Sequence, residues 1–128
     1  MSESSSQNRE WKCYVGDMME FAEKVLGYTN ELDQETFLAD DRTYDATLRN
    51  LELIGEAARR IPINVREAHP DIPWHAIVGT RNRLAHGYLG ISDSVVWSII
   101  EDAIPALLPQ LRSLLEAYET DDGSCAQQ

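Results

Sequence analysis

Several features that would assign a protein to a function class at once are missing from this 128-residue chain. No run of about 18 apolar residues is present, so we expect no membrane span and no membrane partner. Neither type of glycine-rich phosphate-binding loop occurs, which argues against nucleotide-binding enzymes of those classes. There is no Glu-x-x-His pair of the kind that helical bundles use for metals. The sequence therefore predicts neither a bound metal nor a cofactor.

Cysteine is also scarce, and its placement bears on the cellular compartment. Cys13 and Cys125 lie near opposite ends, and Cys125 belongs to the polar tail DDGSCAQQ. A structural disulfide is therefore not expected. The N-terminus, MSESSSQNRE, lacks the basic start and apolar stretch of a signal peptide. Both observations predict a cytoplasmic protein.

Positive charge is in deficit overall, but it is unevenly spread. The net charge is −11, whereas binding a polyanion requires a positive surface. Residues 59–83 carry five arginines against two acidic residues, a local balance of +3 that leaves −14 for the rest of the chain. Nine of the eleven basic residues are arginine, the type suited to forked contacts with phosphate. The pattern fits either a local phosphate-binding cleft or an ordinary solvated helix surface.

Apolar residues recur at steps of three and four, which predicts an all-α protein. We expect disorder in residues 1–8, one helical domain over residues 9–119, and a disordered acidic or polar tail over residues 120–128. Pro105 and Pro109 fall inside the last helix and predict a kink there. The expected architecture is a bundle of four main helices, at about residues 9–26, 42–60, 73–87 and 93–118, with short extra helical turns after Asp33 and at 64–69.

The third predicted helix carries a charge within its apolar stripe. At about 100° per residue, Arg81 falls on the face that carries the apolar side chains. A buried arginine is almost never left unpaired, because removing its charge from water is costly. Arg81 should therefore meet a carboxylate, backbone carbonyls or a cleft that ligand can reach. The apolar members of this face are Trp74, Ile77, Val78, Leu84, Ala85 and Tyr88.

A second face of the same helix contains His75, Gly79, Asn82 and His86. Asn82 and His86 are four residues apart, so the amide can contact and orient the imidazole. Gly79 lacks a side chain, which lets another backbone approach closely. Arg81 and His86 are five residues apart, roughly 140° around the axis, and cannot form a tight pair on a straight helix. They either flank a shared groove or meet partners from a second copy of the chain.

The stretch RNRLAHGY, residues 81–88, resembles the R-x4-H-x-Y motif of HEPN-domain proteins. The longer segment DIPWHAIVGTRNRLAHGYLGIS, residues 71–92, resembles the signature of the HepT-like toxin family. LELIGEAARRIP, residues 51–62, is similar to that family as well. The likeness covers roughly residues 10–118.

One departure from the family pattern follows this block. The family often carries an aspartate directly after the isoleucine, whereas here Ile91 is followed by Ser92 and only then by Asp93. The change either shifts a helix cap or alters the surface that a partner contacts.

The resemblance implies the toxin half of a bacterial toxin–antitoxin pair, which forms a homodimer and whose partner is a small nucleotidyltransferase of the MntA type. It implies metal-independent cleavage of RNA, either single-stranded RNA or transfer RNA, at a composite site on the dimer interface. Arg81 and His86 would be the catalytic pair, and Asn82 the polar residue that positions them. Tyr88 matches the tyrosine that the partner modifies with adenylate. Candidates for RNA binding are Arg83, Arg59 and Arg60, and candidates for the dimer interface are Trp74 and Gly79.

The implied chemistry suits these side chains. RNA carries its own nucleophile, the 2′-hydroxyl, so the protein need only move protons and stabilise charge on phosphorus. An imidazole, with a reference pKa of about 6.5, can accept or donate a proton near neutral pH. A guanidinium can hold phosphate oxygens through two parallel hydrogen bonds. The expected product ends in a 2′,3′-cyclic phosphate.

Two other function classes stay open. The chain could be a dimeric interaction module without catalysis, in which Arg81 pairs structurally and Tyr88 alone is functional. It could also be a metal or small-ligand bundle, with ligands among Cys13 and the histidines. That reading is less favoured, because His69 and His75 straddle two prolines.

Overall fold

The computed structural model describes residues 2–86 and 91–119, with side chains from residue 10 onward. Every regular element within these ranges is helical, so the prediction of an all-α bundle is confirmed. In chain order the elements are α1 (Ser2–Thr29), α2 (Gln34–Ala39), α3 (Asp41–Arg59), α4 (Ile63–Ala68), α5 (Trp74–Ala85), α6 (Asp93–Ser98), the π-helical segment η1 (Ile99–Ala103) and α7 (Ile104–Ala117).

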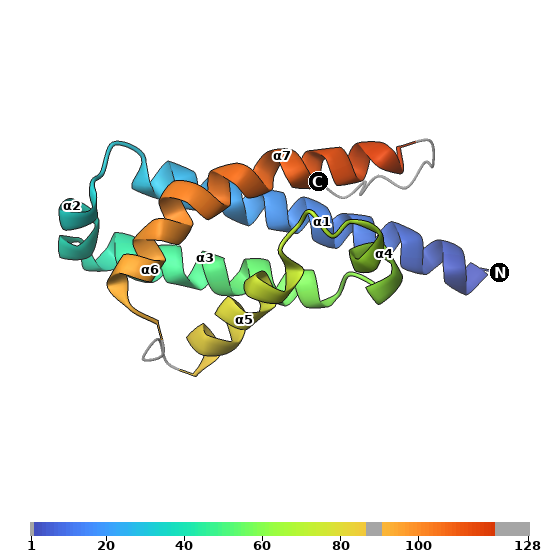
Figure 1. The fold of residues 1–128 in the computed structure, drawn as a ribbon, viewed down its shortest axis with the longest axis horizontal. Coiled ribbons are helices and arrows are strands. Elements are labelled where there is room, and N and C mark those ends of the chain that lie inside the picture. Colours follow the sequence, from blue (N-terminus) through green and yellow to red (C-terminus); the bar gives the residue numbers. More distant parts are fainter. Residues whose placement is uncertain (1, 87–90, 120–128) are drawn as a thin grey trace.

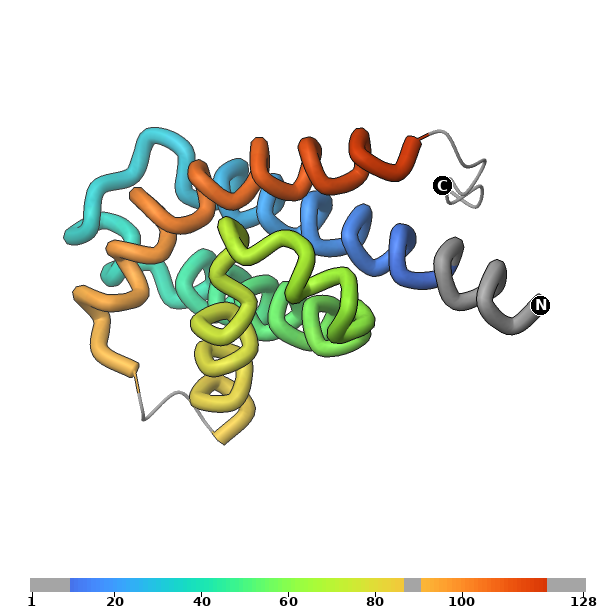
Figure 2. The backbone as a smooth tube through the Cα atoms, turned by 45° about the vertical axis from the view of Figure 1, so that its right-hand side comes forward, coloured from blue at the N-terminus to red at the C-terminus, as the bar shows by residue number. Residues whose placement is uncertain are grey.

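Three long helices form the body of the molecule. α1 lies between α3 and α7 and contacts both (Figure 1). α5 packs against α3, and its C-terminal end extends away from the long helices (Figure 2). The residues at the end of α5 are therefore carried to the margin of the bundle, where a ligand or a second chain can reach them.

The core is a single cluster of apolar side chains from all three long helices. Its α1 members recur at three- and four-residue steps, because one face of a helix must cover α3 and α7 together. Burying each large aliphatic side chain contributes about 1.5–3 kcal/mol relative to exposure. The largest fully buried side chains are Met18, Phe37, Leu48, Ile61, Ile72, Leu84, Leu111 and Leu114.

Most helix ends lie close to the predicted positions, but α1 begins at Ser2, within the segment 1–8 for which disorder was expected. Gly27 was expected to end the first helix, but α1 continues to Thr29, whose hydroxyl donates to the Val25 carbonyl at 2.8 Å. The turn that follows uses Glu31 at a positive φ of 69°. Pro73 precedes α5 as its N-cap residue, one position before the helix begins.

Two aspartates cap the helices that follow the first loop. Asp33 accepts from the backbone N–H of Thr36 at 2.9 Å, and the Thr36 hydroxyl accepts from the Asp33 N–H, which completes a capping box. Asp40 accepts from the Thr43 N–H at 3.2 Å and starts α3. These bonds satisfy N–H groups that a helix leaves unpaired in its first turn. The predicted cap at Asp33 is confirmed.

The predicted break in the last helix appears as a change of helix type. The chain widens into η1 immediately before Pro105, and the backbone N–H of Ile104 bonds the Ile99 carbonyl five residues back. A proline ring clashes with the carbonyl four residues earlier, and a π-turn relieves that clash. The axis bends between α6 and α7 (Figure 1), whereas Pro109 lies within α7.

The departure around Ser92 coincides with a helix cap. The Ser92 side chain accepts from the Val95 N–H at 3.3 Å and is the N-cap of α6. Asp93, in the first turn, accepts a hydrogen bond from the Tyr44 hydroxyl of α3 at 3.1 Å. Both side chains therefore have contacts within this chain, as a shifted cap would require.

The cysteine expectation was wrong, because Cys13 takes part in a disulfide. The second cysteine, Cys125, lies outside the described residues, as does the predicted disorder of residues 120–128. None of the helices in the described part of the chain is long and apolar enough to cross a membrane. The cytoplasmic location stays a prediction.

The two capping aspartates make a testable contribution to acid stability. Hydrogen bonds from Thr36 hold the pKa of Asp33 below its ordinary 3.8, and those from Thr43 do the same for Asp40. Their stabilising effect is therefore complete above pH 3.8 and is lost as the pH falls through the lowered folded-state pKa values. Urea midpoints measured from pH 5 to pH 2 should decline more gently in an Asp33→Asn/Asp40→Asn variant, because asparagine caps but does not titrate. Parallel declines would contradict this assignment.

Candidate functional site

The candidate site begins where α5 crosses α3 at Gly55. A Cβ built on Gly55 would overlap the Arg81 side chain and lie 3.0 Å from the Ile77 carbonyl oxygen. Only glycine therefore permits this crossing distance. The sequence pointed to Gly79 as the place of close approach, but within the described residues no atom outside the surrounding turns of α5 lies within 4 Å of a Cβ there. The close approach inside the chain belongs to Gly55.

Arg81 lies over Gly55 and is held by two acceptors. Its Nη2 donates to Glu56 Oε2 at 2.8 Å, and its Nη1 donates to Asn82 Oδ1 at 3.0 Å. The side chain is 21% exposed, and its Nε is buried without a hydrogen-bond partner in the described part of the chain. Of the three partners expected for Arg81, namely a carboxylate, backbone carbonyls or an accessible cleft, the structure supplies a carboxylate, that of Glu56.

Glu56 lies at the centre of a small charged cluster. Besides Arg81, it receives Arg59 Nη1 on its other oxygen at 3.3 Å. The hydrogen bond from Arg81 is the main reason that the pKa of Glu56 lies below its ordinary 4.5, and the positive charges of Arg81, Arg59 and Arg60 act in the same direction. Glu56 is therefore ionised whenever the site faces neutral solvent, and it balances part of the local positive charge.

His86 ends α5 and is exposed to solvent. Its backbone N–H bonds the Arg83 carbonyl, as in an ordinary helix cap. Asn82 was expected to orient this imidazole, but the structure pairs Asn82 with Arg81, and no hydrogen bond from Asn82 to His86 occurs in the described region. The guanidinium faces α3, whereas the imidazole is at the helix end. Arg81 and His86 do not meet within one chain, as their spacing predicted.

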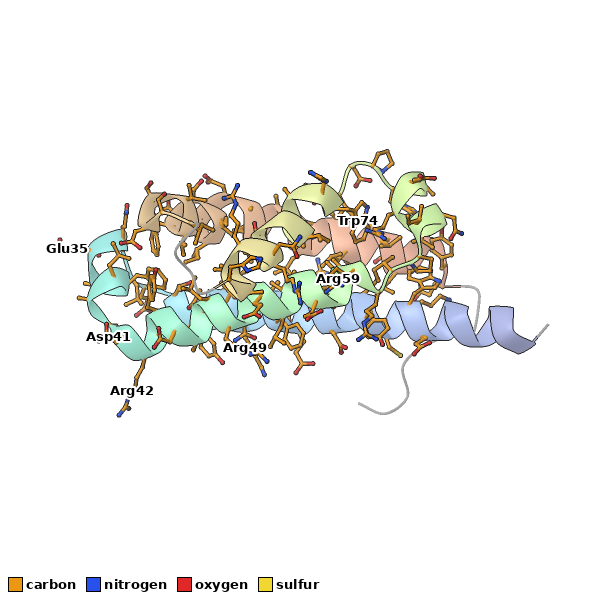
Figure 3. All side chains as sticks on the ribbon, turned by 90° about the horizontal axis from the view of Figure 1, so that it is seen from below. Glu35, Asp41, Arg42, Arg49, Arg59 and Trp74 are labelled. Atoms are coloured by element: carbon orange, nitrogen blue, oxygen red, sulfur yellow. The ribbon has the colours of Figure 1, made fainter. Side chains whose placement is uncertain are left out.

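The other candidate residues divide between surface and core. Arg83 is exposed on α5. Arg60 donates to the Tyr14 hydroxyl at 3.3 Å and lies 5.6 Å from the centre of its ring, a cation–π contact. Trp74 is only 8% exposed, and its Nε1 donates to the His69 carbonyl, so it packs within its own chain (Figure 3). Tyr88 lies outside the described residues.

An apolar cavity lies beside the site, between α3, α5, η1 and α7. It has a volume of about 100 Å³ and contains no charged side chain. Because no charged side chain lines it, this cavity offers no group for acid–base or phosphate chemistry, and the candidate site is the Arg81 side of α5. Among the described residues, no group of three or more His, Cys, Asp or Glu is placed to hold a metal ion.

Comparison with known proteins identifies the family. The family model described as Ribonuclease HepT-like matches residues 18–114, which include α3, α5 and the crossing between them. The chain belongs to the HepT-like family. It is 37% identical over 106 residues to "Probable ribonuclease HepT" of Thermococcus cleftensis, covering 83% of this chain and 96% of that protein. It is 36% identical over 99 residues to "Putative RNase MJ1380" of Methanocaldococcus jannaschii, covering 77% and 91%. No solved structure shows a significant match.

Sequence reasoning missed two residues of this HepT-like site, Gly55 and Glu56. Both stand within the segment LELIGEAARRIP, residues 51–62, which is similar to the family. A glycine in the middle of a helix destabilises that helix by roughly 0.5–1 kcal/mol relative to alanine. Its presence was thus a signal of close approach, and the adjacent acid was the nearest candidate partner for a buried arginine.

Gly55→Ala should destabilise the protein, because the new methyl group overlaps Arg81 and crowds the Ile77 carbonyl. Overpacking of this kind costs about 1–3 kcal/mol. Gly16→Ala in α1 is the matched control: nothing in the described structure lies within 4 Å of a Cβ there, and a gain of up to about 1 kcal/mol is expected. Urea unfolding followed by circular dichroism measures both. Equal effects at the two positions would show that α5 does not approach α3 as described.

Proposed function

We propose that this HepT-like chain is a metal-independent endoribonuclease and the toxin of a toxin–antitoxin pair. The carrying observation is the Arg81 guanidinium, held in a fixed orientation near the helix end that bears an exposed imidazole. The names of the relatives, which describe ribonucleases, support the same reaction. The site offers a phosphate-binding group and a proton-transfer group, which together suffice for cleavage of RNA at its own 2′-hydroxyl.

In the proposed reaction the 2′-oxygen bonds to phosphorus while the bond from phosphorus to the 5′-oxygen breaks. His86 accepts the proton of the 2′-hydroxyl, and the departing 5′-oxygen takes up a proton from solvent water. Arg81 binds the phosphate oxygens, where negative charge develops in the transition state. The products are a 2′,3′-cyclic phosphate and a free 5′-hydroxyl.

The proposed site is composite, with Arg81 from one subunit and His86 from the other. Within one chain these groups lie on different sides of α5, and Arg81 is directed towards α3. The projecting end of α5 and the open space at Gly79 leave room for a second copy to approach (Figure 2). Trp74, buried in its own core, is the weaker of the two interface candidates.

Electrostatics favour a local RNA site over a broad one. Arg83 is exposed beside the catalytic pair, whereas Arg59 and Arg60 are already engaged by Glu56 and by Tyr14. With a net charge of −11, the chain attracts RNA only weakly at long range. We therefore propose that Arg83 contributes to phosphate binding more than Arg59 or Arg60, on single-stranded RNA or transfer RNA.

The proposed control of the toxin is adenylylation of Tyr88 by a cognate MntA-like nucleotidyltransferase. Tyr88 lies two residues after His86 in the chain, so a modification there is close to the imidazole in sequence. The added phosphate is anionic and would oppose binding of a second phosphate near His86. This step explains how an active nuclease could be kept harmless in its own cell.

His86→Ala and Arg81→Ala should each abolish most RNA cleavage. Loss of a proton-transfer group costs about 100-fold to 10,000-fold, and loss of an anion-stabilising group costs a comparable factor. The assay follows 5′-labelled RNA incubated with chelator and tests the product for a cyclic phosphate. Cleavage that persists in both variants would sink the proposal.

Mixing the two variants tests the composite site in the same assay. A mixed dimer contains one subunit with intact Arg81 and one with intact His86, so part of the activity should return. If each chain carried a complete site, the mixture would stay inactive. The alternative, a modified interaction module without catalysis, predicts no cleavage by any form of the protein.

Intact-mass measurement after co-expression with the cognate nucleotidyltransferase tests the control step. At least one adenylyl increment is expected on the wild-type chain, and none at that position in Tyr88→Phe. The modified protein should also cleave RNA more slowly than the unmodified protein. An unchanged mass in an active partner complex would remove the regulatory half of the proposal.

A further inference from the structure

The guanidinium of Arg81 has a definite number of donors left for a ligand. An arginine carries five N–H groups. In the described structure one on Nη2 bonds Glu56, one on Nη1 bonds Asn82, and that of Nε is buried without a partner. One N–H therefore remains on each terminal nitrogen. Two donors on neighbouring nitrogens are what a forked contact with a phosphate needs.

The position of Arg81 is set by α3. Because Gly55 has no side chain, the Cβ and Cγ atoms of Arg81 can pack against the α3 backbone. At the other end of the side chain, Arg81 Nη2 lies 2.8 Å from Oε2 of Glu56, the next residue. A long side chain held at both its base and its tip loses most of its rotamers before any ligand arrives. A side chain ordered in advance binds its ligand without the entropy cost of ordering it.

We propose that Glu56 is a positioning residue, which fixes the Arg81 guanidinium so that its two remaining donors face an RNA phosphate. This inference rests on the proposed function for its catalytic meaning. Glu56 acts through Arg81 and need not touch RNA. The negative charge of Glu56 repels an incoming phosphate, so it weakens the attraction between Arg81 and RNA. Its positive effect is to fix the orientation of the guanidinium.

Two opposite outcomes separate positioning from mere charge neutralisation. If Glu56 only neutralised Arg81, its removal would strengthen RNA binding and raise activity. If Glu56 positions Arg81, Glu56→Ala should lower kcat by about tenfold to a hundredfold, as expected when a catalytic group is displaced. KM should change much less. Glu56→Gln keeps an oxygen acceptor for Nη2 and should recover kcat to within about threefold of wild type.

Glu52 provides the matched control on the same helix. It lies one turn earlier and pairs with Arg49 at 3.5 Å. Arg49 extends from the side of α3 that faces away from α5 (Figure 3). Glu52→Ala removes the same charge from α3 without touching Arg81, so kcat should stay unchanged. A loss equal to that of Glu56→Ala would overturn the positioning role, because it would follow from charge alone.

A second background tests whether Glu56 acts through Arg81. Arg81→Lys keeps a positive charge but cannot make the forked contact. In that background Glu56→Ala should cost less than about twofold, because coupled residues are not additive. An equal cost in both backgrounds would contradict the inference. Circular dichroism checks that each variant is folded.

Nitrogen-15 NMR of the Arg81 side chain tests, independently of activity, whether Glu56 fixes the guanidinium. Separate signals for Nη1 and Nη2 are expected in the wild-type chain and in Glu52→Ala, because two fixed acceptors slow rotation of the guanidinium. Glu56→Ala should merge or broaden them. Unchanged signals in Glu56→Ala would overturn the inference. If the wild-type chain cut no RNA while its NMR signals depended on Glu56, the proposed function would be wrong, but the positioning of Arg81 by Glu56 would be confirmed.

Discussion

The crossing of α5 over α3 is the constraint on which the candidate site depends. Gly55 lets the two backbones approach so closely that the Arg81 side chain lies across α3, where the neighbouring carboxylate can reach it. A larger residue at that position would push α5 outward and take Arg81 away from Glu56. The absence of a Cβ at Gly55 therefore allows Arg81 and Glu56 to pair. That pair in turn links α3 to α5, the helix that leads to His86.

The cost of burying Arg81 is offset locally. A half-buried guanidinium loses part of its hydration. Hydrogen bonds to Glu56 and Asn82 replace the lost contacts with water. Burial is incomplete, so the pair contributes less to stability than its geometry suggests. Its larger effect is on orientation. This explains how an acidic protein can present an ordered cation at one point without a broad positive surface.

Much of the fold was predictable because helical periodicity and capping are local. The four main helices, the cap at Asp33 and the break near Pro105 were all expected from spacing and residue type, and all are present, although α1 begins at Ser2, seven residues before the expected start. The α1 end past Gly27 was missed, since side-chain bonding by Thr29 continued the helix. The disulfide of Cys13 was missed because a contact between residues far apart in the sequence is not encoded in local pattern.

The sequence by itself determined that α5 carries Arg81 on its apolar face, that such a charge needs a partner, and that His86 lies on a different side of the helix. These conclusions follow from 100° of turn per residue and from the cost of desolvating a charge. Only the tertiary structure decided that the partner is Glu56, that Asn82 serves the arginine, and that the close approach is at Gly55. The reason is physical: which side chains from distant segments meet depends on the distance and angle between two packed helices, and no local pattern specifies these.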